Sequence, residues 1–298
     1  MKKNFLIFIG IFLITILPKT AQCQSWNQPC REASCCTAGM GDTLRSNQFV
    51  MRSTLYGIGY TNILDTYLSP TEYTGIEGRI LHERMRMTKI GGGRVSTQSL
   101  LQANVAYTEN RSDTGNEISG LVNWSYGLHY HFNLNKNLRI LAGGLGEING
   151  GFIYNTRNSN NPAQAKAYLN LTASAMAIYK FHIGKHPFTL RYQINVPFAG
   201  VMFSPNYQQS YYEIFTLGNH HGVVKFTSVH NQPSMRQLLT FDIPVSWSTL
   251  RLGYIGDFQQ SKVNHIRCHT YSHAFMVGFV KNFYLIKRKD NLQHKSPF

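Results

Sequence analysis

The sequence has few charged residues, very few acids and, after its first segment, no long apolar run. Only 14% of its 298 residues are charged, and they comprise 29 Lys and Arg against 14 Asp and Glu. No window of 18 apolar residues follows Gln24, which excludes a transmembrane helix from the remainder of the chain. Charges at helical i,i+4 spacing are also missing, so a helical soluble domain is disfavoured. A soluble β domain or a membrane β-barrel remains.

The N-terminal segment has the composition of a secretory signal. Met1-Lys2-Lys3 is positively charged, Asn4–Pro18 is almost entirely apolar, and Ala21-Gln22-Cys23 offers a small-x-small cleavage site. The apolar run is shorter than the roughly 20 residues that a membrane-spanning helix needs. We therefore predict a signal peptide over residues 1–23. An uncleaved anchor helix and lipidation of Cys23 are the alternatives.

Cysteines are scarce, and three of them lie close together. After cleavage four would remain, and in an oxidising periplasm these could pair in three ways: Cys30, Cys35, Cys36 and Cys268. The cluster has no histidines at zinc-like spacing, so we predict disulfides and no metal or other cofactor. Free thiols are the alternative. Residues 24–47 are accordingly predicted to form an N-terminal periplasmic segment.

Aromatic residues and glycine are abundant, with 18 Phe, 17 Tyr and 25 Gly. From Gly120 to Phe132 the even positions are apolar or aromatic and most odd positions are polar, and the same alternation recurs over 167–181, 188–198 and 237–247. Such segments exceed the usual strand length of about 5–6 residues. They match tilted strands that cross a bilayer in roughly 9–11 residues. Their polar face is rich in Asn, Ser, Thr and Gln, which is typical of a barrel lumen.

Connection lengths alternate along the chain, long and polar in odd positions and tight in even ones, as in outer-membrane barrels. We predict an all-β, transmembrane, antiparallel up-and-down β-barrel of outer-membrane type over residues 48–284, followed by a basic tail over 285–298. It has ten strands, or twelve if 203–235 adds a hairpin from Tyr211–Leu217 and Val223–His230. The predicted strands are 49–60, 75–89, 96–109, 118–132, 138–154, 167–182, 188–202, 236–247, 249–259 and 268–284.

Two parts of the sequence resemble a bacterial family known as domain of unknown function 3316. The first is YGIGYTN at Tyr56–Asn62 with DTYLSP at Asp65–Pro70, and the second is SPNYQQSYYEIF at Ser204–Phe215. The similarity covers residues 48–284. It implies an outer-membrane β-barrel and no established activity.

The excess of positive charge predicts anionic neighbours. A secreted protein does not meet nucleic acid, so we expect outer-membrane lipid and lipopolysaccharide-type glycolipid as partners. Alternatively, many of the cations line the lumen or its rim. Inward positions are expected to carry Glu77, Arg79, Arg139, Glu147, Lys180, Arg191, Arg236, Asp242, Arg251 and Asp257.

A barrel of ten to twelve strands has a narrow interior, so inward charges from opposite walls can meet. We predict that a charge network including Glu147, Arg191, Asp242 and Arg251 largely plugs the lumen. A tight hairpin at Ser248 would set Asp242 and Arg251 diagonally across from each other. A narrow, selective channel is the alternative.

The candidate catalytic residues for an enzymatic function are histidines with serines near them. A phospholipase-like outer-membrane lipid hydrolase needs a serine, an imidazole and an orienting group within hydrogen-bond reach, at the membrane face. Ser125, His129 and His131 share a strand but face the lumen. We therefore predict a non-enzymatic barrel, and a Ser and a His converging within about 3 Å at the barrel wall would favour the hydrolase.

The longest outside segment, 203–235, is the predicted working surface, because functional residues concentrate on loops. Its aromatic side chains alternate with polar ones, which suits contact with sugar or lipid. The candidate contact residues are Tyr207, Ser210, Tyr211 and Glu213. The alternative is that these aromatic residues form the membrane girdle and a hairpin core.

Overall fold

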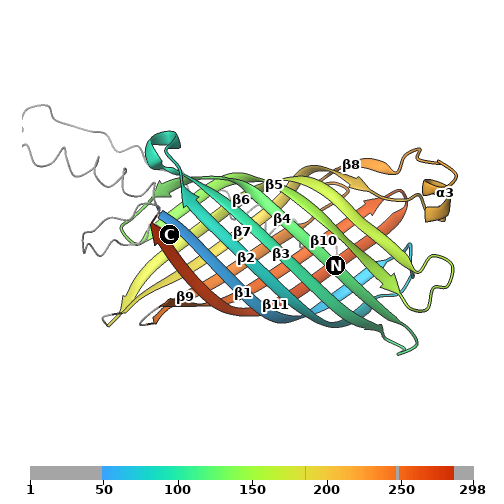
Figure 1. Cartoon of the computed structure of the whole chain (residues 1–298), viewed down its shortest axis with the longest axis horizontal. Coiled ribbons are helices and arrows are strands. Elements are labelled where there is room, and N and C mark those ends of the chain that lie inside the picture. The colour runs from blue at the N-terminus through green and yellow to red at the C-terminus, as the bar shows by residue number, and fades with distance from the viewer. Residues whose placement is uncertain (1–48, 185, 246–247, 285–298) are drawn as a thin grey trace, which may run out of the picture. The chain divides into compact units, whose positions relative to one another are not determined.

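The computed structural model describes residues 49–184, 186–245 and 248–284 (Figure 1). The predicted signal peptide, the segment 24–47 with its three cysteines, and the basic tail lie outside the described residues.

Within the described residues, ten antiparallel strands form a closed β-barrel, which confirms the predicted fold. Each strand pairs with its neighbour in the barrel, and β1 pairs with β11 from Phe49 opposite Tyr284 to Asp65 opposite Cys268, which closes the sheet. The barrel strands are β1 (Phe49–Asp65), β2 (Tyr73–Met87), β3 (Val95–Asn110), β4 (Asn116–Asn133), β5 (Leu138–Asn155), β6 (Ala163–Ile183), β7 (His186–Phe203), β9 (Met235–Val245), β10 (Ser248–Val263) and β11 (Ile266–Tyr284).

The connection between β7 and β9 contains a short helix, α3 (Tyr211–Phe215), and a short strand, β8 (Val224–Ser228). The predicted strand at Tyr211–Leu217 is therefore wrong, and so is the twelve-stranded alternative. Ser210 caps the helix, because its hydroxyl accepts the Glu213 amide at 3.2 Å. β8 pairs with the last part of β7, where β9 no longer reaches.

Connections of two kinds define the two ends of the barrel. The turn end carries the connections at 88–94 and 134–137, and there β6, β9 and β11 end and β1, β7 and β10 begin. The loop end carries those at 66–72, 111–115, 156–162, 204–234 and 264–265. The long loop predicted over 260–267, between the last two predicted strands, is wrong, since Asn264 and His265 form a two-residue turn with φ of 50° and 64°.

Helical structure is confined to short elements. Besides α3, a 3-10 helix, η1 (Ile90–Gly93), lies at the turn end between β2 and β3. In the described part of the chain, no helix has the length and apolar character needed to cross a membrane.

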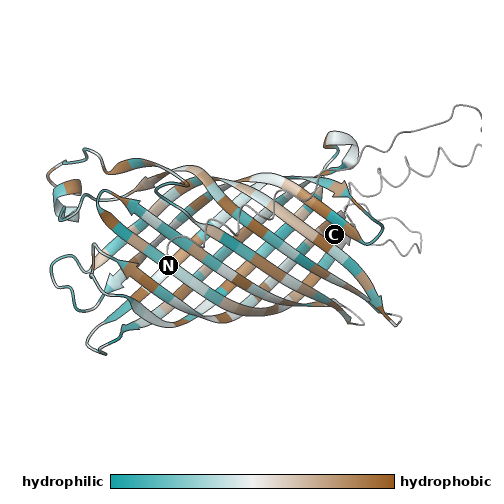
Figure 2. Ribbon diagram, turned by 180° about the vertical axis from the view of Figure 1, so that it is seen from behind, coloured by the Kyte–Doolittle hydropathy of each residue, from teal (hydrophilic) through white to brown (hydrophobic). Residues whose placement is uncertain are grey.

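The strands place apolar side chains outward and most polar ones inward, as the alternation predicts. Trp124, Tyr126 and Phe275 are 45%, 51% and 73% exposed, whereas Asn123 and Gln193 are 4% and 0% exposed. Figure 2 shows the same alternation as brown and teal bands along the strands. The barrel therefore has an apolar belt on its outside.

The interior is layered. After Met87 at the turn end, the inward positions along β2 are Met85, Glu83, Leu81, Arg79 and Glu77, so apolar and charged residues alternate in blocks. Three buried apolar clusters form, one around the first position, one around the third, and one near the loop end with Ile63 and Ile153. The lumen is consequently packed like a protein core.

Candidate functional site

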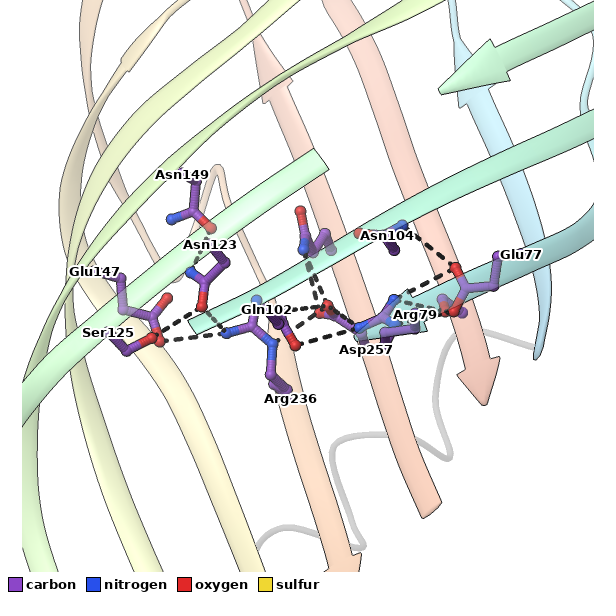
Figure 3. Close-up of polar contacts among 12 residues, drawn as sticks. Glu77, Arg79, Gln102, Asn104, Asn123, Ser125, Glu147, Asn149, Arg236 and Asp257 are labelled. Carbon is purple, nitrogen blue, oxygen red and sulfur yellow. Dashed lines mark hydrogen bonds and ion pairs between the residues drawn. The ribbon is translucent and has the colours of Figure 1, made fainter. Parts of the chain in front are cut away.

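The first charged layer lies between the second and third apolar clusters. Arg79 Nε is 3.0 Å from Glu77 and its Nη1 is 3.2 Å from Asp257, which projects from β10. Arg236 on β9 lies 3.2 Å from the same Asp257 and 3.6 Å from Glu147 on β5. Figure 3 shows these side chains meeting across the lumen. We call this group the upper network.

Neutral side chains complete the upper network. The Asn123 amide oxygen accepts from Arg236 Nη1 at 3.1 Å and from the Ser125 hydroxyl at 2.9 Å, and its nitrogen donates to Asn149 at 2.6 Å (Figure 3). Gln102 contacts Asp257 from β3. Polar groups buried away from water need such partners, and these hydrogen bonds connect side chains of β3, β4, β5, β9 and β10 within the layer.

The second charged layer, the lower network, is centred on Glu83. Its carboxylate lies 2.5 Å from Arg191 and 2.9 Å from Arg251. Arg251 also donates to both oxygens of Asp242, at 2.6 and 2.7 Å. Gln98 donates to the remaining Glu83 oxygen at 2.7 Å. All these groups are buried except Asp242, which is half-buried.

The four predicted network residues divide between these two layers. Asp242 and Arg251 do meet, directly opposite each other in register rather than diagonally. Glu147 belongs to the upper network, whereas Arg191 belongs to the lower one. The sequence reasoning missed Glu83, although it has the same period-two spacing on β2 as Glu77 and Arg79.

A third buried group lies at the loop end. Lys166 Nζ is 2.6 Å from Asp65 and 3.0 Å from the Cys268 sulfur. Cys268 forms no disulfide within the described residues, and its predicted partners Cys30, Cys35 and Cys36 lie outside them. In the described part of the chain, no group of three or more His, Cys, Asp and Glu is placed to hold a metal ion.

Little free space remains between the networks and the loops. A cavity of about 40 Å³ lies beside Lys166, Tyr168 and Gln259, and another of about 10 Å³ lies beside Glu147 and Arg236. Volumes of this size hold one or a few water molecules. They give no room to an organic substrate.

The loop candidates have different environments. Tyr207 is exposed and Glu213 is half-buried, but Ser210 is the helix cap and Tyr211 packs against the barrel rim. The Tyr211 hydroxyl accepts the Ala165 amide at 2.7 Å. Two exposed aromatic residues of α3, Tyr212 and Phe215, were not predicted, because their exposure follows from a helical turn that buries Ile214.

Tyr67 attaches this segment to the loop after β1. Its hydroxyl donates to the Gln209 carbonyl at 2.8 Å, and its ring lies edge-on to Tyr211 at 6.0 Å. Burial, with smaller contributions from Tyr211, Asp65 and Glu213, raises the pKa of Tyr67 to about 12. The hydroxyl thus stays protonated as a donor, and the segment 204–234 is fixed to the rim.

Serine and histidine meet inside the barrel in a closed setting, and Ser228 also contacts His230 at the exposed loop end. His129 Nε2 lies 2.8 Å from the Ser174 hydroxyl, and Ser125 donates to Asn123 instead of to a histidine. Both partners of the first pair are buried in the lumen, and among the described residues no group hydrogen-bonds the second ring nitrogen of His129. A triad needs that orienting group and access to substrate.

The model of the family described as "Protein of unknown function (DUF3316)" matches residues 5–290. The chain belongs to this family. The resemblance seen in the sequence is thereby confirmed.

Among curated proteins there is no match. Solved structures with a similar fold include the transport unit of the autotransporter AIDA-I from Escherichia coli, 10% identical over 80% of this chain and 96% of that one, with a TM-score of 0.39. The outer membrane protease OmpT from Escherichia coli is 6% identical over 80% and 97%, with a TM-score of 0.43. The translocator domain of the autotransporter NalP from Neisseria meningitidis is 9% identical over 80% and 91%, with a TM-score of 0.35.

In this DUF3316 barrel, the two networks contain nine charged side chains that leave water on folding. Such groups are tolerated only when opposite charges and hydrogen bonds compensate them. Each acid of the two networks contacts at least one guanidinium: Glu77, Glu83, Glu147, Asp242 and Asp257. The buried charges of the two networks are thus compensated by one another inside the lumen.

Proposed function

We propose that the protein is a non-enzymatic, non-conducting outer-membrane barrel that presents the segment 204–234 to the outside. The observation that carries the proposal is the filled lumen, in which two charged networks alternate with three apolar clusters. The turn end then faces the periplasm and the loop end faces outward, as in barrels with short periplasmic turns.

To be conducted, an ion would have to pass both the apolar clusters and the charged networks of the lumen. An ion crossing the apolar clusters would lose its hydration shell without finding polar partners. An ion crossing the lower network would have to displace Arg191 and Arg251 from Glu83, which leaves buried charges unpaired. The free-energy cost of both steps opposes ion passage through the unperturbed protein.

The external surface is supported by a different set of contacts. Tyr67, Tyr211 and Asn264 tie the segment 204–234 to the barrel rim through hydrogen bonds. On this fixed base, Tyr207, Tyr212 and Phe215 remain more than half exposed. Aromatic rings beside polar groups suit sugar or lipid contact, so we propose lipopolysaccharide-type glycolipid of the outer leaflet as the ligand class.

Planar-bilayer recordings test the closed lumen. We expect negligible conductance from the unmodified protein. Asp242→Asn removes one of the two acids bound by Arg251, so it should destabilise the barrel and produce intermittent leak currents. Glu213→Gln on α3 is the matched control and should do neither. Large, ion-selective conductance from the unmodified protein would replace this proposal with a channel.

Glycolipid binding tests the external surface separately. The folded protein is titrated with lipopolysaccharide, and Tyr212→Ala with Phe215→Ala should weaken binding about tenfold or more, because two exposed rings are removed. Val229→Ala, at another exposed apolar position of the same segment, is the control and should retain binding. Unchanged binding in the double variant would exclude this face as the ligand surface.

A further inference from the structure

Among the described residues, seven exposed cations lie at the turn end. Those on strands and connections near this end are Arg52, Arg84, Arg86, Lys89, Arg94, Lys136 and Lys281. Among the described residues near the turn end, the acids are Glu83 and Asp242, and both point into the lumen toward Arg191 and Arg251. The outer surface at this end therefore carries strong positive charge.

Part of this charge forms a row across three adjacent strands, β11, β1 and β2 (Figure 1). Arg52 lies directly opposite Lys281 on one side and directly opposite Arg84 on the other. Arg86 follows two positions further along β2 on the same outward face. We call these four residues the cationic row.

Like charges directly opposite each other in a sheet are destabilising. Within the described residues, Arg84, Arg86 and Lys281 form no ion pair with an acid. A bound anion that contacts several of these side chains would neutralise the repulsion between the aligned cations and so stabilise their arrangement.

The cationic row lies at the edge of the apolar belt. On the same outward faces, the next large side chains toward the loop end are Phe279, Tyr56 and Ile80, which are 48%, 59% and 48% exposed. Between the row and this belt, the Thr54 hydroxyl and His82 Nδ1 are 2.9 Å apart. From the belt to the turn end, the surface thus changes from apolar to polar to cationic, in the same order in which a membrane changes from hydrocarbon to phosphate groups.

We propose that the cationic row binds the phosphate of an anionic phospholipid in the leaflet at the turn end. Guanidinium groups bind phosphate oxygens through paired, charge-assisted hydrogen bonds, and three or four cations converge here on one strip of surface. This site is at the opposite end of the barrel from the segment 204–234. It does not depend on what that segment binds.

The test is a lipid titration of the full-length protein in detergent, read by native mass spectrometry. Phosphatidylglycerol is the anionic probe and phosphatidylcholine the neutral one. The variant R84Q/R86Q/K281Q is compared with R111Q/K225Q/K262Q, which removes three exposed cations at the loop end. Heat-dependent gel mobility confirms that each variant is folded.

We expect the turn-end variant to bind phosphatidylglycerol at least about tenfold more weakly, because three of the four cations of the row can no longer attract the lipid phosphate. The loop-end variant should bind as the unmodified protein does, and phosphatidylcholine should not distinguish the three. Equal weakening in both variants would mean general charge attraction and overturn the proposal. Inorganic phosphate that competes fully at millimolar concentration would also overturn it, by showing a site for small anions.

Discussion

Replacing Glu83 by Gln tests the buried charge network most directly. The Glu83 carboxylate is shared by Arg191 at 2.5 Å and Arg251 at 2.9 Å. Without it, Arg251 keeps both oxygens of Asp242, but Arg191 has no other acid among the described residues and retains only the Met85 sulfur at 3.5 Å. Breaking a buried pair in this way costs about 3–5 kcal/mol, because one charge is left uncompensated.

The assay is urea unfolding of the barrel from lipid vesicles, followed by gel mobility and tryptophan fluorescence. Glu83→Gln should lose about 3–5 kcal/mol, whereas Glu109→Gln, an exposed acid on β3, should change stability by less than about 0.5 kcal/mol. Adding Arg191→Met to Glu83→Gln should recover at least about 2 kcal/mol, because no unpaired guanidinium then remains. A loss below about 1 kcal/mol, or strictly additive effects in the double variant, would refute the reasoning, since either result implies a hydrated lumen.

Three further predictions concern the belt, the wall and the loop end. Val122→Arg, at a position 50% exposed within the belt, should lower the free energy of unfolding from vesicles by about 2–4 kcal/mol. Val229→Arg, 51% exposed at the loop end, should lower it by less than about 0.5 kcal/mol. Equal losses in the two variants would contradict the position of the belt. A Cβ at Gly143 would lie 1.9 Å from a backbone oxygen of β4, so Gly143→Ala should lower the unfolding free energy by about 1–3 kcal/mol. A Cβ at Gly150, on the same strand, would meet nothing within 4 Å, so Gly150→Ala should leave the unfolding free energy nearly unchanged. The pKa of Tyr67 is raised from 10.0 to about 12, so the stabilisation from its hydrogen bond is complete below pH 10 and is lost as the pH rises toward 12. Limited proteolysis of 204–234 should increase over that window, and Tyr67→Phe should abolish the pH dependence; a persisting dependence would assign it to another group.

The strand pattern could be predicted because it depends on local periodicity. The ten predicted strands match the observed ones closely, for example 138–154 against Leu138–Asn155, and the outward and inward sets are as expected. In a closed barrel every strand separates lipid from lumen, so each strand repeats the same alternation of apolar and polar residues. The predictions were wrong where this alternation ends, at α3 and at the Asn264-His265 turn.

Helix α3 illustrates why loops escaped prediction. Tyr211–Leu217 is aromatic and suits a strand, but Ser210 supplies an N-cap and Ile214 packs inward, so one turn of helix forms on the barrel rim. Tertiary contacts such as that of Tyr211 with Ala165 then decide which aromatic rings remain exposed. These contacts have no counterpart in the sequence spacing.

The sequence by itself determined the fold class, the strand positions and which charges face inward. Only the tertiary structure decided which of those charges meet, because closure and strand tilt bring together residues such as Arg79 and Asp257, on β2 and β10, at 3.2 Å. It also decided that Arg191 pairs with Glu83 and not with Glu147. A period of two fixes the face of a side chain, but its height along the lumen depends on the stagger of all ten strands, which no single strand encodes.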